Sequence, residues 1–231
     1  MIMNPVAFFN KIRQTISEIK TPYEYGDFDA DSFRFIFGKV KDILDKEDSY
    51  FKFKMEKGCT KGVLIPLNGD FVFKIPFDFD VSGWSSLSLD YCNKEVDHFH
   101  EAKNAGLDYV FVKTKFFDEL ENQFGAKLPI YIQDKVTPFT GGDSSDDRAY
   151  REISGRYSNT DRLAPAWVEY FCNCYGMEAF DDLGTFVDKV GINDLHSNNI
   201  GYYHDEPVIF DYSGFYDGTS NSSYWNTECD Y

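Results

Sequence analysis

Two stripes of apolar residues at helical spacing occupy residues 1–47. The first stripe consists of Val6, Phe9, Ile12, Ile16 and Ile19. The second consists of Phe33, Phe37, Val40, Ile43 and Leu44. Because residues three or four positions apart lie on the same face of a helix, each stripe predicts an amphipathic helix. The Asn4-Pro5 pair is typical of a helix start, and the second helix is expected from about Asp31 to Lys46.

The pattern then changes to the alternation and short apolar runs that favour strands. The strand-like segments are YFKFKM (50–55), VLIPL (63–67), FVFKIPF (71–77), YVFVKT (109–114) and PIYIQDKV (129–136). The Asn68-Gly69 pair between the second and third segments is the strongest hairpin signal of the chain. A helix is expected from about Asp90 to Asn104.

The second half of the chain has a different pattern. Residues 140–147 (TGGDSSDD) have the composition of a solvated connector, and residues 165–190 are expected to be helical with a break near Gly176. Two short strand candidates follow, at 199–203 and 207–211. The order of these elements predicts an α+β fold with two lobes. We expect a helical extension (1–47), a β-rich N-lobe (48–135) and a smaller, helical C-lobe (136–231).

Charge and composition exclude several classes of partner. The chain has 39 acidic and 23 basic residues, and its formal net charge of −16 opposes binding to nucleic acid or to an anionic membrane. It shows neither an apolar run long enough to span a membrane nor the features of a signal peptide. The five cysteines are odd in number and lack metal-binding spacing. We therefore expect a cytoplasmic location, reduced thiols and no membrane partner.

Acids and amides gather in the stretch GINDLHSNNIGYYHDEPVIFDYSG, residues 191–214. If residues 204–206 form the loop of a hairpin, Asn199 lies opposite Asp211. Facing residues have Cβ atoms ~4.5–5.5 Å apart, so the two side chains can share one hard cation such as Mg²⁺ with phosphates and water. Asp194 lies five residues before Asn199 and can reach the same cavity. It is expected to receive or orient the proton of an attacking hydroxyl group.

The order D-x-x-x-x-N, hairpin, D-x-x-G resembles the catalytic loop and the magnesium-binding motif of the protein-kinase superfamily. Here the motifs read Asp194-Leu-His-Ser-Asn-Asn199 and Asp211-Tyr-Ser-Gly214. The loop is similar in particular to that of small serine/threonine kinases of bacteriophages, which also read D-x-H-S-x-N. The resemblance covers about residues 50 to 216 and implies a bilobal kinase-like fold with a truncated C-lobe. The structural alternative is a polar loop with capping Asp and Asn residues.

The resemblance implies further site residues upstream. Lys74 in FVFKI matches the strand lysine that binds the α- and β-phosphates of ATP, and Glu95 on the following helix is its expected partner, with Glu101 as the second choice. Gly58 and Gly62 stand where the family has a glycine-rich phosphate loop. A hairpin turn explains these two glycines equally well.

The family's fifth strand and hinge align with PIYIQDKV. This alignment places Gln133 at the entrance of the adenine pocket, and the Asp134 C=O and the Val136 N–H on the adenine edge. His196 stands where eukaryotic serine/threonine kinases have a lysine. It either contacts the transferred phosphoryl group or braces the loop.

The chain also departs from the family's pattern. Ile192 and Asn193 replace the His and Arg that precede the catalytic Asp, so we expect no switching by phosphorylation of an activation loop. Only 17 residues follow Gly214, which is too few for the family's activation segment. A peptide acceptor would then need another platform, such as the polar region 140–165. The four arginines of that region either bind an acidic partner or form ion pairs on helix surfaces.

The resemblance implies an ATP- and Mg²⁺-dependent protein kinase that phosphorylates serine or threonine hydroxyl groups of host proteins. Its catalytic residues would be Asp194, Lys74 and His196, and its metal ligands Asn199 and Asp211. A small-molecule phosphotransferase is an alternative that His196 and the short C-lobe favour. A pseudokinase or acidic decoy that binds a host protein is another.

Overall fold

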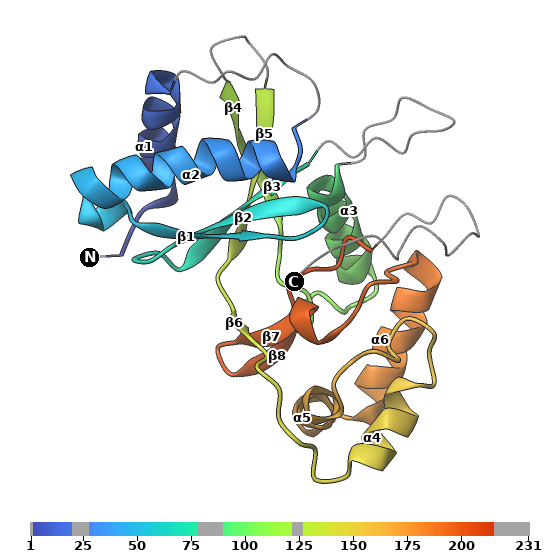
Figure 1. Ribbon diagram of the computed structural model, residues 1–231. Coiled ribbons are helices and arrows are strands. Elements are labelled where there is room, and N and C mark those ends of the chain that lie inside the picture. The colour runs from blue at the N-terminus through green and yellow to red at the C-terminus, as the bar shows by residue number, and fades with distance from the viewer. Residues whose placement is uncertain (1, 20–27, 78–89, 122–126, 215–231) are drawn as a thin grey trace. The chain divides into compact units, whose positions relative to one another are not determined.

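The computed structural model describes residues 2–19, 28–77, 90–121 and 127–214 (Figure 1). The chain divides into two compact units. Unit 1 comprises Met1–Asn93 and Thr114–Lys135, and unit 2 comprises Lys94–Lys113 and Val136–Glu228. Unit 1 combines helices with an antiparallel sheet, and unit 2 is mainly helical, so the fold is α+β, as the sequence predicts.

Unit 1 begins with two helices, α1 (Pro5–Glu18) and α2 (Ala30–Glu47), and this confirms both predicted helices. Side-chain caps explain where they start. The Asn4 side chain accepts a hydrogen bond from the Val6 N–H at 2.8 Å, and Asp29 accepts one from the Ser32 N–H at 2.8 Å. The buried faces of the two helices carry Phe8, Phe9, Ile12, Phe33, Phe37, Val40 and Leu44.

The sheet of unit 1 has the strand order β1-β2-β3-β5-β4, and all its neighbouring strands are antiparallel. Its strands are β1 (Phe53–Lys57), β2 (Lys61–Pro66), β3 (Phe71–Pro76), β4 (Lys115–Glu121) and β5 (Lys127–Asp134). The turn at Asn68-Gly69 joins β2 to β3, as predicted. Helix α3 (Tyr91–Asn104) follows β3 in the chain, and its residues are divided between the two units.

The two faces of this sheet differ in chemistry, because successive side chains of a strand point to opposite sides. On one face the rings of Phe73 on β3 and Phe8 on α1 are stacked, with their centroids 5.7 Å apart. The opposite face of β3 carries Val72 and Lys74, and Val72 lies opposite Gln133 of β5 in the ladder. One face is therefore an aromatic core under the N-terminal helices, and the other brings Lys74 and Gln133 to the same side.

Unit 2 packs three helices around a small sheet and the end of α3. Its elements are α4 (Asp147–Ser154), α5 (Pro165–Tyr175), α6 (Met177–Val190), β6 (Thr137–Pro138), β7 (Ile200–Tyr203) and β8 (Glu206–Ile209). The predicted break between α5 and α6 is confirmed at Gly176, whose φ of 91° suits glycine. Trp167 is fully buried, and its Nε1 donates to the Gly201 C=O at 3.3 Å. This hydrogen bond joins α5 to the β7–β8 hairpin.

Two predictions about local structure are wrong. Residues 109–114 do not form a strand of a sheet; Phe111 makes an isolated parallel bridge to Ile209, and β4 is formed instead by the next segment, Lys115–Glu121. Reduced thiols are found at Cys172 and Cys174, but Cys59 is disulfide-bonded. Within the described part of the chain, no helix is both long and apolar enough to cross a membrane.

Candidate active site

Residues 191–199 form a loop between α6 and β7 that is fixed at both ends. Helix α6 ends at Gly191, which has a left-handed φ of 83°. The N–H groups of Gly191 and Ile192 both donate to the Val187 C=O, at 2.9 and 3.0 Å. Ile192 and Leu195 are buried in the core of unit 2. The loop is therefore held by apolar anchors on either side of Asp194.

Asp194 has two cationic or proton-donating neighbours. Its Oδ1 lies 3.4 Å from Nη1 of Arg162 and 3.6 Å from Nε2 of His196. The His196 Nδ1 accepts a hydrogen bond from the Asn198 N–H at 3.2 Å. In a neutral ring this bond requires the proton to be on Nε2, the atom that faces Asp194. His196 therefore braces the loop, and its contact with a phosphoryl group stays a prediction.

The hairpin after this loop corrects the predicted register by one residue. Strand β7 pairs with β8 so that Ile200 lies opposite Ile209, and the loop contains two residues, His204 and Asp205, rather than three. Their φ angles are 51° and 65°. Two-residue hairpin loops favour such left-handed residues, because the twist of the turn then matches that of the strands.

Asn199 and Asp211 remain neighbours despite this correction. The Asn199 C=O accepts hydrogen bonds from the N–H groups of Phe210, at 3.0 Å, and Asp211, at 3.4 Å. The Asn199 Nδ2 donates to the Asp194 C=O at 2.6 Å. This bond leaves Oδ1 as the end of the amide that can bind a cation. The structure thus connects all three residues of the predicted motif through Asn199.

Gly214 of the D-x-x-G motif lies against the same loop. Its φ is 66°, and a Cβ at this position would lie 3.1 Å from the Gly191 carbonyl oxygen and 3.2 Å from the Asn193 Oδ1. A larger residue would therefore be strained and would push the loop away. The buried Tyr212 fixes the segment from its other side, since its hydroxyl donates to the Val112 C=O at 2.8 Å.

The two residues expected to form the lysine–glutamate pair are both buried. Lys74 is 3% exposed and Glu95 is 0% exposed, and such side chains are rarely buried without a partner. Lys74 belongs to unit 1 and Glu95 to unit 2, so their pairing stays a prediction. The second choice, Glu101, has a side chain that is 57% exposed and lies 3.6 Å from His98. Its exposure favours Glu95 over Glu101.

The expected phosphate-loop glycines have packing roles. The Gly58 N–H donates to the Lys61 C=O at 2.9 Å and closes the turn between β1 and β2. Atoms of the Phe33 ring lie 2.3–2.5 Å from the position of a Cβ on Gly62. Gly62 thus makes room for helix α2 on the sheet. That either glycine approaches a phosphate stays a prediction.

The expected adenine-binding residues lie at the end of β5. Gln133 is buried, and its Nε2 donates to the Thr114 Oγ1 at 2.9 Å. Asp134 is the last residue of β5. Among the described residues, none accepts a hydrogen bond from the Val136 N–H. An available donor just beyond the strand is suited to bind the edge of a purine.

The sequence pattern indicated no role for Lys61 and no contact between Arg162 and Asp194. Lys61 is 3% exposed and lies on the same face of the sheet as Lys74, because Lys61 pairs with Pro76 and Val63 with Lys74. The alternation K-x-V at the start of β2 is a signal that could have revealed it. Arg162 touches Asp194 across 32 residues of sequence, and no local pattern could have indicated this contact.

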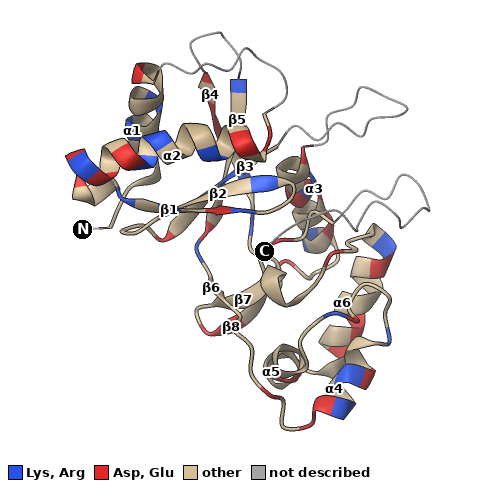
Figure 2. Ribbon diagram, viewed as in Figure 1, with Lys and Arg blue, Asp and Glu red and all other residues tan. Residues whose placement is uncertain are grey.

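The arginines of region 140–165 are largely engaged in ion pairs. Arg148 lies 3.2 Å from Glu152 on the surface of α4, where basic and acidic residues are interspersed (Figure 2). Arg156 lies 3.3 Å from Asp181, and Arg162 pairs with Asp194. Ion pairing within unit 2 therefore accounts for three of the four arginines.

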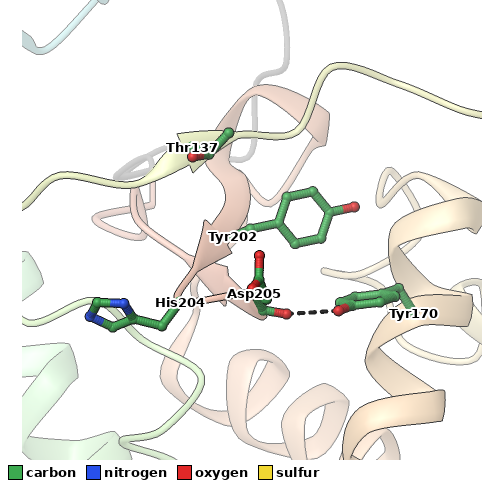
Figure 3. Close-up of a pocket in the computed structure, with 5 residues that line it drawn as sticks. All are labelled: Thr137, Tyr170, Tyr202, His204 and Asp205. Atoms are coloured by element: carbon green, nitrogen blue, oxygen red, sulfur yellow. Dashed lines mark hydrogen bonds between the residues drawn. The ribbon is translucent and has the colours of Figure 1, made fainter.

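Two of the hollows on the described surface are lined by residues of unit 2. The smaller has a volume of about 360 Å³ and is lined by Thr137, Tyr170, Tyr202, His204 and Asp205 (Figure 3). The Tyr170 hydroxyl donates to the Asp205 C=O at 2.7 Å. A strand rises ~3.3 Å per residue, so this hairpin turn lies roughly 15 Å from Asn199. None of the residues that line the smaller hollow belongs to the loop of residues 191–199.

The larger hollow adjoins the loop of residues 191–199. It has a volume of about 730 Å³. It is lined by Phe139, Thr140, Gly141, Gly142, Asp143, Asp147, Arg151, Asp161, Arg162, Leu163, Ala164, Pro165, Ser197 and Asn198. Ser197 and Asn198 belong to the loop itself, and Arg162 contacts Asp194. A molecule in this hollow would therefore lie next to Ser197, Asn198 and Arg162.

The donor set suits a metal ion that is shared with a nucleotide. Among the described residues, no three or more His, Cys, Asp or Glu side chains are grouped to hold a metal ion by themselves. Mg²⁺ that is bound to phosphates needs only one or two protein oxygen ligands, and the Asn199 Oδ1 and the Asp211 carboxylate can supply them.

A scan against models of known protein families and a search of the curated proteins both find no match.

Proposed function

We propose that the protein is an ATP- and Mg²⁺-dependent kinase that phosphorylates serine or threonine hydroxyl groups of proteins. One observation carries this proposal. The Asn199 side chain is bonded to the Asp194 C=O at 2.6 Å, and its own C=O accepts the Asp211 N–H at 3.4 Å. These bonds join the backbones of Asp194 and Asp211 to one residue, and this supports a site in which Asp194 serves the acceptor hydroxyl and Asn199 and Asp211 bind a cation, as phosphoryl transfer requires.

The arrangement of elements supports a bilobal kinase-like fold. Protein kinases carry the phosphate-binding lysine on the third strand of the N-lobe, and Lys74 lies on β3. Strand β3 is paired with β5, whose Gln133 lies on the same face as Lys74. The mainly helical unit 2 carries the loop with Asp194.

The chain's own residues account for the main requirements of the reaction. Phosphoryl transfer depends on positioning and on neutralising negative charge. Asp194 would accept the proton of the acceptor hydroxyl as its oxygen bonds to the γ-phosphorus and the bond to the ADP oxygen breaks. Lys74 would bind the phosphates of ATP. A magnesium ion held by Asn199 and Asp211 would neutralise phosphate charge.

Asp194→Asn tests this proposal directly. We expect transfer of label from γ-labelled ATP to proteins of a cell extract to fall by roughly 10²–10⁴-fold, because the proton acceptor is lost. Binding of ATP, measured by calorimetry, should persist, since Asp194 is assigned to the acceptor. Asp182→Asn, at an exposed position of α6, is the control and should label normally.

Three results would overturn the proposal in different ways. Undiminished labelling by Asp194→Asn would remove the catalytic assignment. Label that appears only in small metabolites would indicate a small-molecule phosphotransferase. Absence of ATP binding by the wild-type chain would indicate a pseudokinase or decoy.

A further inference from the structure

The 730 Å³ hollow is a groove built entirely from unit 2. Its lining comes from residues 139–143 with Asp147 and Arg151, and from residues 161–165. Ser197 and Asn198 of the catalytic loop also line it. The groove therefore connects the surface of the 140–165 region with the neighbourhood of Asp194.

The segment 140–145 combines an anchored end with an open stretch of backbone. Glu169 of α5 accepts hydrogen bonds from the Ser144 hydroxyl at 2.8 Å and from the Ser145 N–H at 2.7 Å, and also binds the Ser145 hydroxyl. Among the described residues, no partner bonds to the N–H or C=O groups of 140–143. An anchored segment with open backbone groups can pair with the main chain of an extended peptide.

The charges of the lining favour a cationic occupant. Asp143, Asp147 and Asp161 outnumber the two arginines Arg151 and Arg162, and Arg162 is already paired with Asp194. Asp143 and Asp161 are exposed and belong to different segments of the lining. The net charge of −16 adds a field that attracts basic molecules to the surface.

We propose that this groove is the acceptor site and that it takes an extended polypeptide segment in which a serine or threonine is flanked by lysine or arginine. The segment's main chain bonds to residues 140–143, and its basic side chains bind Asp143 and Asp161. The hydroxyl group of its serine or threonine lies next to Ser197 and Asn198, beside the Asp194–Arg162 pair. This inference rests on the proposed kinase function.

A positional peptide library tests the groove. Each peptide has a central serine, and each flanking position is fixed in turn as lysine, arginine, aspartate, glutamate or alanine. With γ-labelled ATP, we expect the full chain to label peptides with basic flanking residues preferentially. For the preferred peptide, Asp143→Asn/Asp161→Asn should raise KM roughly 2- to 30-fold, the effect of losing two exposed ion pairs. Its KM for ATP should not change.

A matched control separates the groove from the general charge of the protein. Glu152→Gln/Asp182→Asn removes two carboxylates that do not line the groove and should leave both KM values unchanged. The wild-type preference should weaken as salt is raised, because ions screen exposed charges. A preference for acidic residues, absence of any charge preference, or equal effects of the two double variants would overturn the groove assignment.

A second readout is independent of catalysis. Hydrogen exchange of residues 139–147 and 161–165 should slow when the preferred basic peptide is added, and should not respond to its glutamate counterpart. Protection elsewhere on the chain would place the acceptor on another surface. Loss of ATP binding by the wild-type chain would instead count against the kinase function itself, so the two failures are distinguishable.

Discussion

The loop of residues 191–199 in unit 2 and the glycine turn of unit 1 (residues 58–62) are supported in opposite ways. In the loop, the polar residues hold each other: Asn199 bonds to the Asp194 backbone, and Arg162 and His196 flank the Asp194 carboxylate. In the turn, Gly62 is explained by the ring of Phe33 that lies over it. The loop is thus held by polar contacts among its own residues and with Arg162, whereas the absence of a side chain at Gly62 is accounted for by packing.

The largest expected effect on the rate of phosphoryl transfer comes from two buried lysines of unit 1, Lys61 and Lys74. Lys74→Met should lower the rate of phosphoryl transfer by about 10²–10³-fold or more, because a preorganised donor to the phosphates is lost. Lys61→Met, on the same face of the sheet, should lower it less, because no contact with ATP is assigned to Lys61. Initial rates with γ-labelled ATP measure both effects, and melting temperatures show whether the variants are folded. Wild-type rates in both variants would exclude this face from nucleotide binding.

Gly62→Ala compares packing with function at the glycine turn itself. The added Cβ meets the Phe33 ring at 2.3–2.5 Å, so we expect a loss of about 1–3 kcal/mol in the free energy of unfolding. Gly58→Ala is the control, since the nearest atom to its Cβ is 3.7 Å away; its effect should be small. Denaturant unfolding measures both. A rise in the KM for ATP without loss of stability in Gly62→Ala would assign this glycine to the phosphates.

Elements with a strong local pattern could be predicted from the sequence. The stripes of α1 and α2 and the Asn68-Gly69 turn follow from periodicity and from one dipeptide. The choice between residues 109–114 and Lys115–Glu121 could not be made this way, because both segments suit a strand. Burial of Val110 and Val112 beside Ile209, a tertiary effect, decided it.

The candidate site was predictable in its residues but not in its contacts. The spacing of Asp194, Asn199 and Asp211 identified one locality, yet the register was wrong by one. The number of residues in the hairpin loop depends on the left-handed conformations of His204 and Asp205. A sequence does not indicate such conformations at residues other than glycine.

Arg162 tests the polar support of the loop with a smaller expected effect. Its side chain is 58% exposed, and exposed ion pairs contribute about 0.2–1 kcal/mol. Arg162→Gln should therefore lower kcat roughly 2- to 5-fold without changing the KM for ATP. Arg162→Lys should restore most of the rate, because it retains the charge. If the glutamine and lysine variants behave alike, the charge of Arg162 does not position Asp194.

The smallest expected effect is on the pH dependence of stability. A segment held by hydrogen bonds to a carboxylate should lose stability in acid, whereas a segment held by apolar packing should not. Hydrogen bonds from the Ser145 hydroxyl, the Ser144 hydroxyl and the Ser145 N–H hold the pKa of Glu169 below its ordinary value of 4.5. The folded chain therefore binds this proton less readily than the unfolded chain. The stabilisation is fully present above pH 4.5 and is lost as the pH falls through the lower folded pKa.

Melting temperatures of the wild type, Glu169→Gln and Ser145→Ala between pH 7 and pH 3 measure this loss. Both variants should melt below the wild type at neutral pH, by a constant margin down to about pH 5. Below pH 4.5 the margin should begin to shrink, because the unfolded chain binds the proton first, and it should be lost once the pH falls through the lower folded pKa and the carboxylate releases its serine donors. The margin between wild type and Gly62→Ala should stay constant over the same range, since a ring and a methyl group do not titrate. Parallel curves for Glu169→Gln would show that the segment 140–145 is held by packing, as the glycine turn is.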